Sequence, residues 1–342
     1  MKIALITGIT GQDGAILAEM LSNKGYFVHG MVRRGSTINT DRIDHLIEKE
    51  KVIDHYGDLT DTNSIYRLLM EIQPDMIFNM GAMSQVRTSF DIPEYTGDAT
   101  GLSVCRLLEA TKNLIKRGIL NDKLKIYHAS SSEMFGLSPP LQSETTPFKP
   151  ISPYGCAKLY GFSMCRTFRL GYGMFVCTGI LFNHEGKLRG ETFLTKKAIR
   201  KLCRIKLGRD EKLFLGNLSA KRDWGSAIDY MDAVYRIIHH SIPDEFVVST
   251  NEYHSIQEFV ERVAKRLNVD IADHVIIEDR LFRPNEVPEL RGDFSKIRDT
   301  LGWRPKKSLN DIIEEMVSSV MEEEKKKLYF EQQDEKKERL LE

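Results

Sequence analysis

The feature that most constrains the fold of this 342-residue chain is a set of three glycines between a strand-like and a helix-like segment. Residues 2–7 are mostly apolar, Gly8, Gly11 and Gly14 follow at intervals of three, and residues 15–20 have the composition of a helix. Such glycines permit a tight turn and let a helix N-terminus approach a pyrophosphate. The glycine spacing alone is weak evidence for a ligand site. Its position between a strand and a helix, however, predicts a dinucleotide site rather than a simple turn.

The rest of the chain continues the same alternation. Apolar runs at residues 27–32, 51–56, 75–80, 125–129 and 174–181 alternate with helix-length segments, which is typical of buried parallel strands. Beyond about Asn183 the pattern is mixed, with helices expected at 192–207, 228–240 and 255–267 and a short strand at 245–248. We therefore expect an α/β protein with a doubly wound parallel Rossmann sheet and a smaller mixed α/β substrate-binding lobe that can exchange segments with it.

Composition excludes several classes of partner. A hydrophobic content of 41% is enough for a large core, and 49 basic residues balance 49 acidic ones, so no overall charge favours nucleic acid or an anionic membrane. The N-terminus enters a strand without a targeting pattern, which predicts a cytoplasmic location. The five cysteines lack metal-ligand spacing, so we expect reduced thiols and no metal site. The charged residues from 322 to 342 predict a solvated terminal helix or a frayed end.

The second half of the nucleotide motif favours NADP. About twenty residues past the last glycine, where NAD sites place an acid, the chain has Arg33, Arg34, Gly35 and Ser36. Guanidinium groups and a hydroxyl suit a 2′-phosphate, although solvated charges or a subunit contact would use the same residues.

Two more short segments follow apolar runs, at residues 57–59 and 80–82, where strand ends face the ligand crevice. Asp58 in the first of them is placed either to hold the adenine amino group or to cap a helix starting near Thr60.

A second cluster predicts catalysis. Tyr154 and Lys158 lie one helical turn apart behind Ser152 and Pro153, which mark a capped helix start. A nearby ammonium lowers the pKa of a phenol, so that Tyr154 can accept a proton from a sugar hydroxyl; the alternative is an exposed i,i+4 pair.

Ser131, at the end of the run 125–129, is placed to hydrogen-bond the same hydroxyl. Glu133 adds a carboxylate that a simple reductase does not need, and it can remove the acidic proton next to a ketone. The alternatives for Glu133 are a helix cap or a surface charge.

These residues, with those at 183–185, 189–193 and 221–225, resemble the GDP-mannose 4,6-dehydratases of the extended short-chain dehydrogenase/reductase superfamily, and the similarity spans nearly the whole chain. The resemblance implies that Glu133 is the general base and that Tyr154 with Lys158 serves the oxidation. Ser131 takes the place of the usual Thr and keeps its hydroxyl. Residues 186–188 read Gly-Lys-Leu, which departs from the Ser-Pro-Arg more usual there and puts the conformation of that loop in question.

The resemblance also implies two sets of binding residues. The NADP contacts are Gly8, Thr10, Gly11, Gln12, Asp13, Gly14, Arg33, Arg34, Gly35, Ser36, Asp58, Leu59, Met80, Gly81, Ala82, Met83, Ser84, Tyr95, Lys158, His184 and Arg189. The nucleotide-sugar contacts are Ser84, Ser132, Asn183, Lys197, Arg222, Arg283 and Glu286. Two of these have simpler alternatives, because His184 could be a structural histidine and Arg222 could pair with Asp223.

The resemblance divides the chain into an NADP-binding domain at 1–182, a mainly nucleotide-sugar-binding lobe at 183–330 and a charged tail at 331–342, and it implies a homodimer or homotetramer. The segment from Arg34 to Arg42 is a candidate for the subunit contact near the 2′-phosphate.

The hypothesis for the reaction is dehydration of GDP-mannose with a tightly bound NADP that is regenerated in each turnover. Tyr154 takes the proton of the C4 hydroxyl while a hydride passes to NADP⁺, Glu133 then removes the C5 proton, water leaves from C6, and the hydride returns to C6. A GDP-manno-heptose 4,6-dehydratase would use the same residues. An epimerase or reductase of the superfamily would not need Glu133, and a sensor that binds NADP without catalysis is the most distant alternative.

Overall fold

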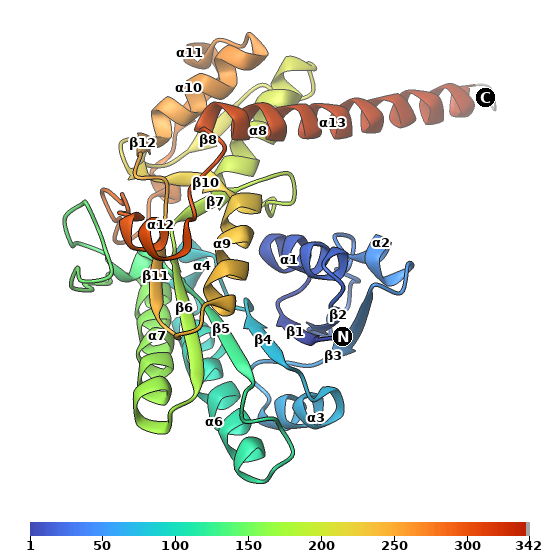
Figure 1. The fold of residues 1–342 in the computed structure, drawn as a ribbon. Coiled ribbons are helices and arrows are strands. Elements are labelled where there is room, and N and C mark those ends of the chain that lie inside the picture. The colour runs from blue at the N-terminus through green and yellow to red at the C-terminus, as the bar shows by residue number, and fades with distance from the viewer. Residues whose placement is uncertain (340–342) are drawn as a thin grey trace.

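The computed structural model describes residues 1–339, and its central element is a seven-stranded parallel sheet with helices on both faces (Figure 1). The strand order is β11-β6-β5-β4-β1-β2-β3, so the direction of winding reverses between β1 and β4, where ligand crevices form in such sheets. The strands are β1 Ile3–Thr7, β2 Phe27–Val32, β3 Val52–Tyr56, β4 Met76–Asn79, β5 Lys125–Ser131, β6 Phe175–Leu181 and β11 Glu245–Val248.

The predicted fold class is confirmed. Each of the six apolar runs expected from the sequence forms a strand of this sheet within two residues of the predicted bounds. The seventh strand, β11, comes from the second half of the chain and pairs in parallel with β6. The assignment of residues 1–182 and 183–330 to separate ligands stays a prediction, although the sheet itself draws on both.

Two layers of helices cover the sheet. One face carries α1 (Gln12–Asn23) and α9 (Ala227–His239), and the other carries α3 (Thr62–Ile72), α6 (Ser103–Lys116) and α7 (Pro153–Tyr172). Their apolar spacing explains the packing: in α3, Ile65, Leu68, Leu69 and Ile72 recur at helical intervals and are buried against the sheet.

A smaller lobe sits above the carboxyl ends of the strands (Figure 1). Its core lies between α8 (Leu194–Lys206), α10 (Ile256–Leu267) and α13 (Leu309–Arg339). The three helices expected from the sequence after residue 183 are confirmed as α8, α9 and α10, and small sheets join the segments between them.

The remaining elements are α2 Asp44–Ile47, α4 Val86–Ser89, α5 Pro93–Thr96, the π-helical η1 Gly97–Leu102, η2 Ser132–Met134, β7 Asn183–Glu185, β8 Leu213–Leu215, β9 Lys221–Arg222, β10 Trp224–Ser226, β12 His254–Ser255, α11 Ile271–His274, β13 Val275–Ile277, η3 Asp279–Leu281 and α12 Ser295–Leu301.

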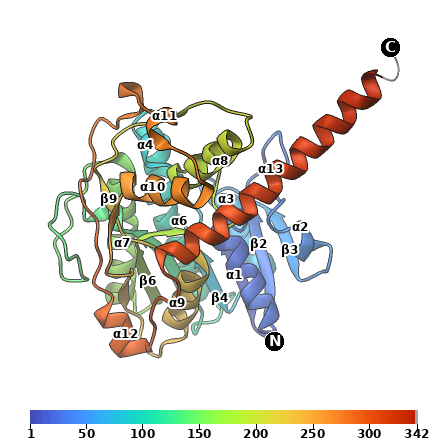
Figure 2. The same cartoon turned by 90° about the horizontal axis from the view of Figure 1, so that it is seen from above.

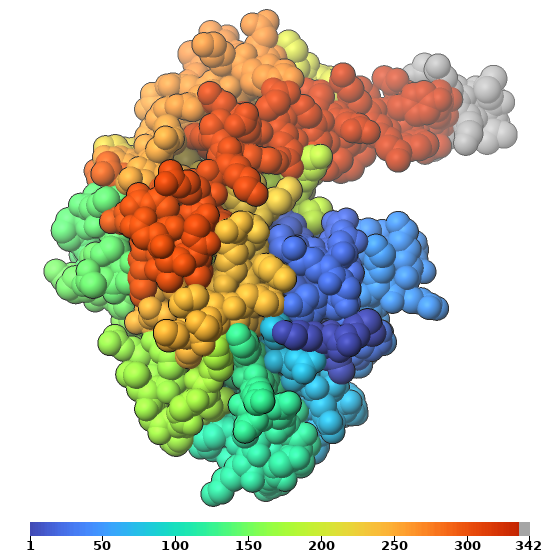
Figure 3. All heavy atoms as spheres, viewed as in Figure 1, coloured from blue at the N-terminus to red at the C-terminus, as the bar shows by residue number. Residues whose placement is uncertain are grey.

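The last helix, α13, packs along its first half and then extends away from the body of the protein (Figures 2 and 3). Six of its residues between Leu309 and Val320 are buried in the core of the smaller lobe. The charged segment from residue 322 continues this helix to Arg339, so the helical alternative of the prediction is the one observed; residues 340–342 of the predicted tail lie outside the described residues. The expectation of a fully solvated helix is wrong at Glu324, whose side chain is only 1% exposed because three arginines surround it.

The cysteines form no disulfide among residues 1–339. All five thiols are free, and Cys165, Cys177 and Cys203 are buried. Among residues 1–339, every helix is too short or too polar to cross a bilayer.

Candidate active site

The glycine turn between β1 and α1 is built for close backbone contact. Gly8 has a positive φ of 68°, and a Cβ at this position would lie 2.7 Å from the Cα of Gly81 at the end of β4. A Cβ on Gly14 would lie 2.3 Å from the carbonyl oxygen of Gly8. The N-cap residue Gly11 gives α1 no side-chain cap, so the first N–H groups of the helix face the turn. These residues fit a bound pyrophosphate.

A buried ion pair fastens the start of α1 to the smaller lobe. His184 on β7 lies with its Nε2 2.8 Å from a carboxylate oxygen of Asp13, and its Nδ1 is 2.7 Å from the carbonyl of Phe182. Burial raises the pKa of Asp13, but the charge and hydrogen bond of His184 outweigh it and the pKa is lowered overall. Burial lowers the pKa of His184, but Asp13 reverses that shift and the pKa is raised. His184 is therefore more than a solitary structural histidine.

A neighbouring amide and an arginine support the same turn. Gln12 donates to the carbonyl of His184 at 3.2 Å, and its Oε1 is buried with no hydrogen-bond partner among the described residues. Arg42 donates to the carbonyl oxygens of Thr10 and Leu188 at 3.2 and 2.9 Å. The sequence placed Arg42 only at the end of a candidate subunit contact. Its hydrogen bonds join residues 32 and 146 positions away in the chain, and such contacts leave no local sequence pattern.

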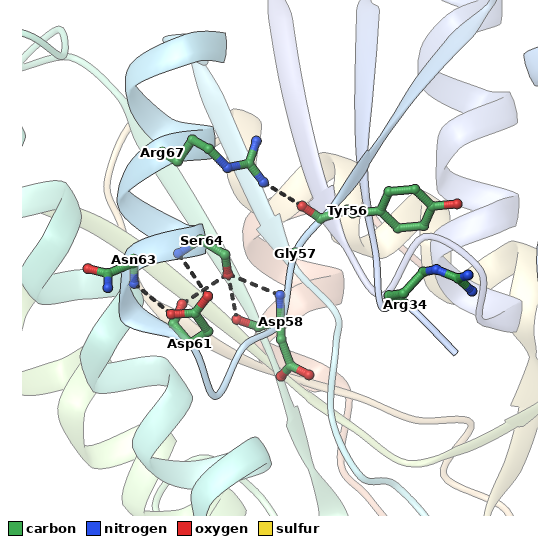
Figure 4. A pocket seen from close by; sticks show the side chains of 8 residues that line it. All are labelled: Arg34, Tyr56, Gly57, Asp58, Asp61, Asn63, Ser64 and Arg67. Atoms are coloured by element: carbon green, nitrogen blue, oxygen red, sulfur yellow. Dashed lines mark hydrogen bonds between the residues drawn. The ribbon is translucent and has the colours of Figure 1, made fainter. Parts of the chain in front are cut away.

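The residues after β2 and β3 form an exposed, basic end of the crevice. Arg33 to Ser36 are exposed, and Arg33 donates to the hydroxyl of Tyr95 on α5 at 2.7 Å. A pocket of about 580 Å³ lies between this segment and the start of α3. Arg34, Tyr56 and Asp58 are among the residues that line it (Figure 4). Arg34 lies over the Tyr56 ring at 5.9 Å. A flat ring and a guanidinium at this place suit a nucleobase and its phosphate.

The alternative role of Asp58 as a helix cap is wrong. Helix α3 begins at Thr62, and Asp61 caps it by accepting hydrogen bonds from the N–H groups of Asn63 and Ser64. Asp58 instead accepts from the N–H and hydroxyl of Thr60 through one carboxylate oxygen, Oδ1. Its contact with adenine stays a prediction.

The loop after β4 is fixed by a short chain of buried hydrogen bonds. Thr7 donates to Asn79 at 2.7 Å and accepts from the N–H of Gly81 at 3.1 Å. Leu59, Met80 and the segment from Gly81 to Ser84 therefore line the same edge of the sheet as the glycine turn, with Ser84 exposed in the loop.

Tyr154 and Lys158 lie in the first turns of α7, where Ser152 accepts from the N–H of Gly155 at 3.0 Å and Pro153 takes the first helical position. Both side chains are buried, which contradicts the alternative of an exposed pair. Lys158 donates to the carbonyl of Ala129 at 2.7 Å, and its Nζ is 5.8 Å from the centre of the Tyr154 ring. Burial lowers the pKa of Lys158 to about 8. For the neutral Tyr154 phenol burial acts in the opposite direction and raises the pKa, while a hydrogen bond with Ser131 opposes this shift.

Glu133 lies beside this pair with a free oxygen. The residue follows β5 in the short helix η2, where Ser131 accepts the N–H of Glu133 at 3.2 Å. The Glu133 side chain is 9% exposed, which excludes the surface-charge alternative, and the cap of η2 is Ser131 rather than Glu133. Its Oε2 is buried with no hydrogen-bond partner among the described residues, and Oε1 is 3.9 Å from Arg283. A carboxylate with one unpaired oxygen can act as a base.

Three of the predicted sugar-nucleotide residues meet next to Glu133. Glu286 accepts from Arg222 at 2.6 Å and from Arg283 at 3.1 Å. The alternative of an Arg222–Asp223 pair is wrong, because the Asp223 carboxylate instead accepts from the N–H groups of Thr250, Asn251 and Gly292. Arg283 thus lies between the carboxylates of Glu133 and Glu286, and Arg222 joins the cluster through Glu286.

Other predicted residues lie around this centre without joining it. Ser132 is buried at the start of η2, and Asn183 begins β7. Lys197 on α8 donates to the carbonyl of Phe214, and no hydrogen bond among residues 1–339 connects it to the Glu286 cluster.

The loop that departs from the usual family pattern at 186–188 has a defined place. Arg189 contacts Glu185 at 3.0 Å and stacks on the Phe193 ring at 3.8 Å. Arg189 thus faces the same region as Asp13, whose pKa it helps to lower.

Comparison with known proteins decides the family. The family model for GDP-mannose 4,6 dehydratase matches residues 5–316. The chain belongs to the GDP-mannose 4,6-dehydratase family. It is 46% identical over 328 residues to GDP-mannose 4,6 dehydratase 1 of Arabidopsis thaliana, covering 94% of this chain and 90% of that protein. It is 43% identical over 345 residues to GDP-mannose 4,6 dehydratase of Homo sapiens, covering 94% and 92%.

Solved structures with lower identity share the fold of this dehydratase-family chain. UDP-glucose 4-epimerase of Thermus thermophilus in complex with NAD superposes with a TM-score of 0.80 at 21% identity, covering 93% of this chain and 98% of that one. An RMD structure from Pseudomonas aeruginosa complexed with NADPH gives a TM-score of 0.75 at 21% identity, covering 94% and 100%. The fold is thus that of nucleotide-sugar enzymes with nicotinamide cofactors.

Proposed function

We propose that the protein is an NADP-dependent GDP-mannose 4,6-dehydratase, a carbon–oxygen lyase that converts GDP-D-mannose to GDP-4-keto-6-deoxy-D-mannose and water. Family membership supports the substrate class. The observation that carries the reaction type is the buried Glu133 carboxylate, with one unpaired oxygen, next to the Ser131, Tyr154 and Lys158 set. An oxidoreductase that only moves a hydride has no use for this second base.

The cofactor proposed is NADP. The glycine turn and the uncapped start of α1 would hold the pyrophosphate, and Arg33 and Arg34 would hold the 2′-phosphate. When bound, NADP⁺ supplies an acceptor for the hexose C4 hydride and a donor that returns it at C6. Tight binding is expected because loss of the cofactor between the half-reactions would strand the intermediate.

The first proton transfer is assigned to Tyr154. Its phenol would accept the proton of the C4 hydroxyl, which Ser131 orients through a hydrogen bond. Burial alone makes the phenol too weak an acid, because it raises the pKa of Tyr154. The protonated Lys158 compensates by stabilising the phenolate, and a pKa of about 8 leaves most of its amines charged near neutral pH.

The second proton transfer is assigned to Glu133. Once C4 is a ketone, the C5 proton becomes acidic, and the free Oε2 of Glu133 would remove it. The protonated Glu133 would then give this proton to the C6 hydroxyl, which leaves as water. After the hydride returns to C6, C5 would take a proton from solvent, which balances the proton that Tyr154 removed from the C4 hydroxyl and releases. Arg222 and Arg283 would neutralise the diphosphate of the substrate.

A GDP-manno-heptose 4,6-dehydratase is the second candidate. The observations that favour it are Ser131 in place of the usual Thr and the altered sequence at 186–188. A homodimer or homotetramer, and a cytoplasmic location, stay predictions. A cofactor-binding sensor without catalysis is disfavoured because it gives Glu133 no role.

The test is to incubate the protein with GDP-mannose or GDP-manno-heptose and follow loss of one water by mass spectrometry. Glu133→Gln should lower the dehydration rate by about 10²- to 10⁴-fold, while reduced nicotinamide still forms because Tyr154 and Lys158 are intact. Glu261→Gln, an exposed change on α10, is the matched control. Dehydration by Glu133→Gln at the rate of the unmodified protein would refute the proposal. Faster turnover of GDP-manno-heptose than of GDP-mannose would assign the heptose as the substrate.

A further inference from the structure

A network of charges ties the base of the projecting half of α13 to α8. The Glu324 carboxylate accepts from Arg200 at 2.5 Å, from Arg209 at 2.9 Å and from Arg204 at 3.2 Å. Glu323 accepts from Arg200 at 2.6 Å. Burial raises the pKa of Glu324, but the guanidinium groups more than offset this and hold it below its usual value. The carboxylate is therefore charged, and it fixes where α13 lies over α8.

The same arginine reaches the loop that joins β7 to α8, residues 186–193. Arg200 donates to both carboxylate oxygens of Glu191 in this loop, at 2.6 and 2.7 Å. Beside it, Lys196 donates to the carbonyl of Lys187 at 3.0 Å and lies 3.8 Å from Glu323. Two cations of α8 thus hold the loop on one side and the carboxylates of α13 on the other.

The 186–193 loop in turn borders the dinucleotide crevice. Arg42 bridges the carbonyls of Leu188 in the loop and Thr10 in the glycine turn. Arg189, a predicted NADP contact, lies in the middle of the loop. A continuous set of hydrogen bonds therefore runs from Glu323 and Glu324 to the backbone of the nucleotide-binding turn.

Glu323 and Glu324 lie beyond residue 316, where the match to the family model ends. The loop residues 186–188 depart from the pattern usual in the family. Two glycines, Gly186 and Gly190, and no proline in this loop leave its backbone more freedom, which external contacts must restrict if the loop is to keep one conformation.

We propose that Glu323 and Glu324 are positioning residues that hold the 186–193 loop, and with it Arg189, in the conformation that binds the dinucleotide. The inference rests on the proposed function, since it needs a dinucleotide at the loop. A loop that is already ordered loses less conformational entropy when the ligand binds, so its affinity is higher. Coupling of this kind between distant residues and a ligand amounts to about 0.5–2 kcal/mol.

The test is fluorescence titration of the nucleotide-free full chain with NADPH. The double variant Glu323→Gln/Glu324→Gln should raise the dissociation constant roughly 3- to 10-fold, within the coupling range above. The double variant Glu314→Gln/Glu322→Gln removes the same charge from α13 at exposed positions that do not contact Arg200, Arg204, Arg209 or Lys196, and it should leave the constant unchanged. Hydrogen exchange of the amides at 186–193 should speed up only in the first variant.

A second variant keeps the test decisive if the first one unfolds. Glu191→Gln removes the partner of Arg200 at the other end of the path, where the side chain is half exposed. It should weaken NADPH binding to a similar degree, and combining it with the first variant should add little further loss, because residues in one network are not additive.

Three results would overturn the inference: unchanged NADPH affinity in the Glu191→Gln variant, additive losses in the combined variant, or equal exchange at 186–193 in all proteins. Failure of the proposed function looks different, because the unmodified protein would then bind NADPH without dehydrating GDP-mannose, or would not bind NADPH at all. In that case the hydrogen-exchange comparison still decides whether α13 orders the loop.

Discussion

The buried Lys158 should destabilise the protein that it serves. Its pKa falls from the ordinary value of 10.5 to about 8 in the folded chain. This difference corresponds to about 3 kcal/mol of cost to the folded state when the amine is charged. Replacement by Met removes that cost, but it leaves the carbonyl of Ala129 without its donor, a loss of about 1 kcal/mol. We expect Lys158→Met to stabilise the nucleotide-free protein by about 2 kcal/mol at pH 7.

The sign of this effect depends on pH. Below pH 8 Lys158 is protonated in both the folded and the unfolded chain, so the folded state bears the full cost. Between pH 8 and 10.5 the unfolded chain binds more protons, and the stability of the unmodified protein rises with pH. Above pH 10.5 the amine is neutral in both states, and Lys158→Met should then be less stable because only the lost hydrogen bond remains.

Thermal unfolding at pH 7 and pH 10.5 measures the effect. With an unfolding entropy of about 2.1 cal/mol/K per residue, about 2 kcal/mol shifts the midpoint by roughly 3 °C in a chain of this length. Lys123→Met, at an exposed position before β5, controls for the loss of one positive charge. A shift of the same size at both pH values, or a lower midpoint at pH 7, would show that burial of charged Lys158 is not costly. Dehydration by Lys158→Met should be slower throughout, since the Tyr154 phenolate loses its counter-charge.

Three further predictions concern the turn and the catalytic phenol. Gly14→Ala places a Cβ 2.3 Å from the carbonyl oxygen of Gly8, so we expect about 1–3 kcal/mol of destabilisation in denaturant unfolding; unchanged stability would contradict the close packing. Asp13→Asn should destabilise by about 3 kcal/mol near pH 5 and by less at pH 9. The lowered pKa of Asp13 stabilises the folded state at pH values above the ordinary carboxyl pKa of 3.8. The raised pKa of His184 also stabilises the folded state, but this stability is lost as the pH rises through the raised pKa. Equal losses at both pH values would count against an ionic pair. Tyr154→Phe should lower the rate of C4 oxidation about 10²- to 10⁴-fold, measured as reduced nicotinamide in a single turnover, and a normal rate would assign the first proton transfer elsewhere.

The sheet was predictable because its signal is local. An interior strand of a parallel sheet is buried on both faces, so residues 125–129 or 174–181 read as mostly apolar runs between helices. The glycine turn was predictable for the same reason, because it needs specific residues at neighbouring positions. Strand β11 was recognised as a strand at 245–248, but nothing local indicates that it completes the sheet beside β6.

The contacts within the site were less predictable. Arg222 and Glu286 are 64 residues apart, and Arg200 and Glu324 are 124 residues apart. An ion pair between distant elements depends on the final packing and has no periodicity in the sequence. The family resemblance could name Arg222 and Glu286 as binding residues, but their pairing, the hidden role of Arg42 and the burial of Glu324 emerge only from the structure.

The place of β11 in the sheet has a consequence for synthesis of the chain. When β6 leaves the ribosome, its outer backbone groups have no neighbour, because the strand that covers them ends about 70 residues later. At about 5–20 residues per second, the delay is on the order of 4–14 seconds. An uncovered strand edge is a template for pairing with other chains. During this delay the uncovered edge of β6 is open to aggregation. We therefore expect chaperones to bind the nascent chain mainly in this interval.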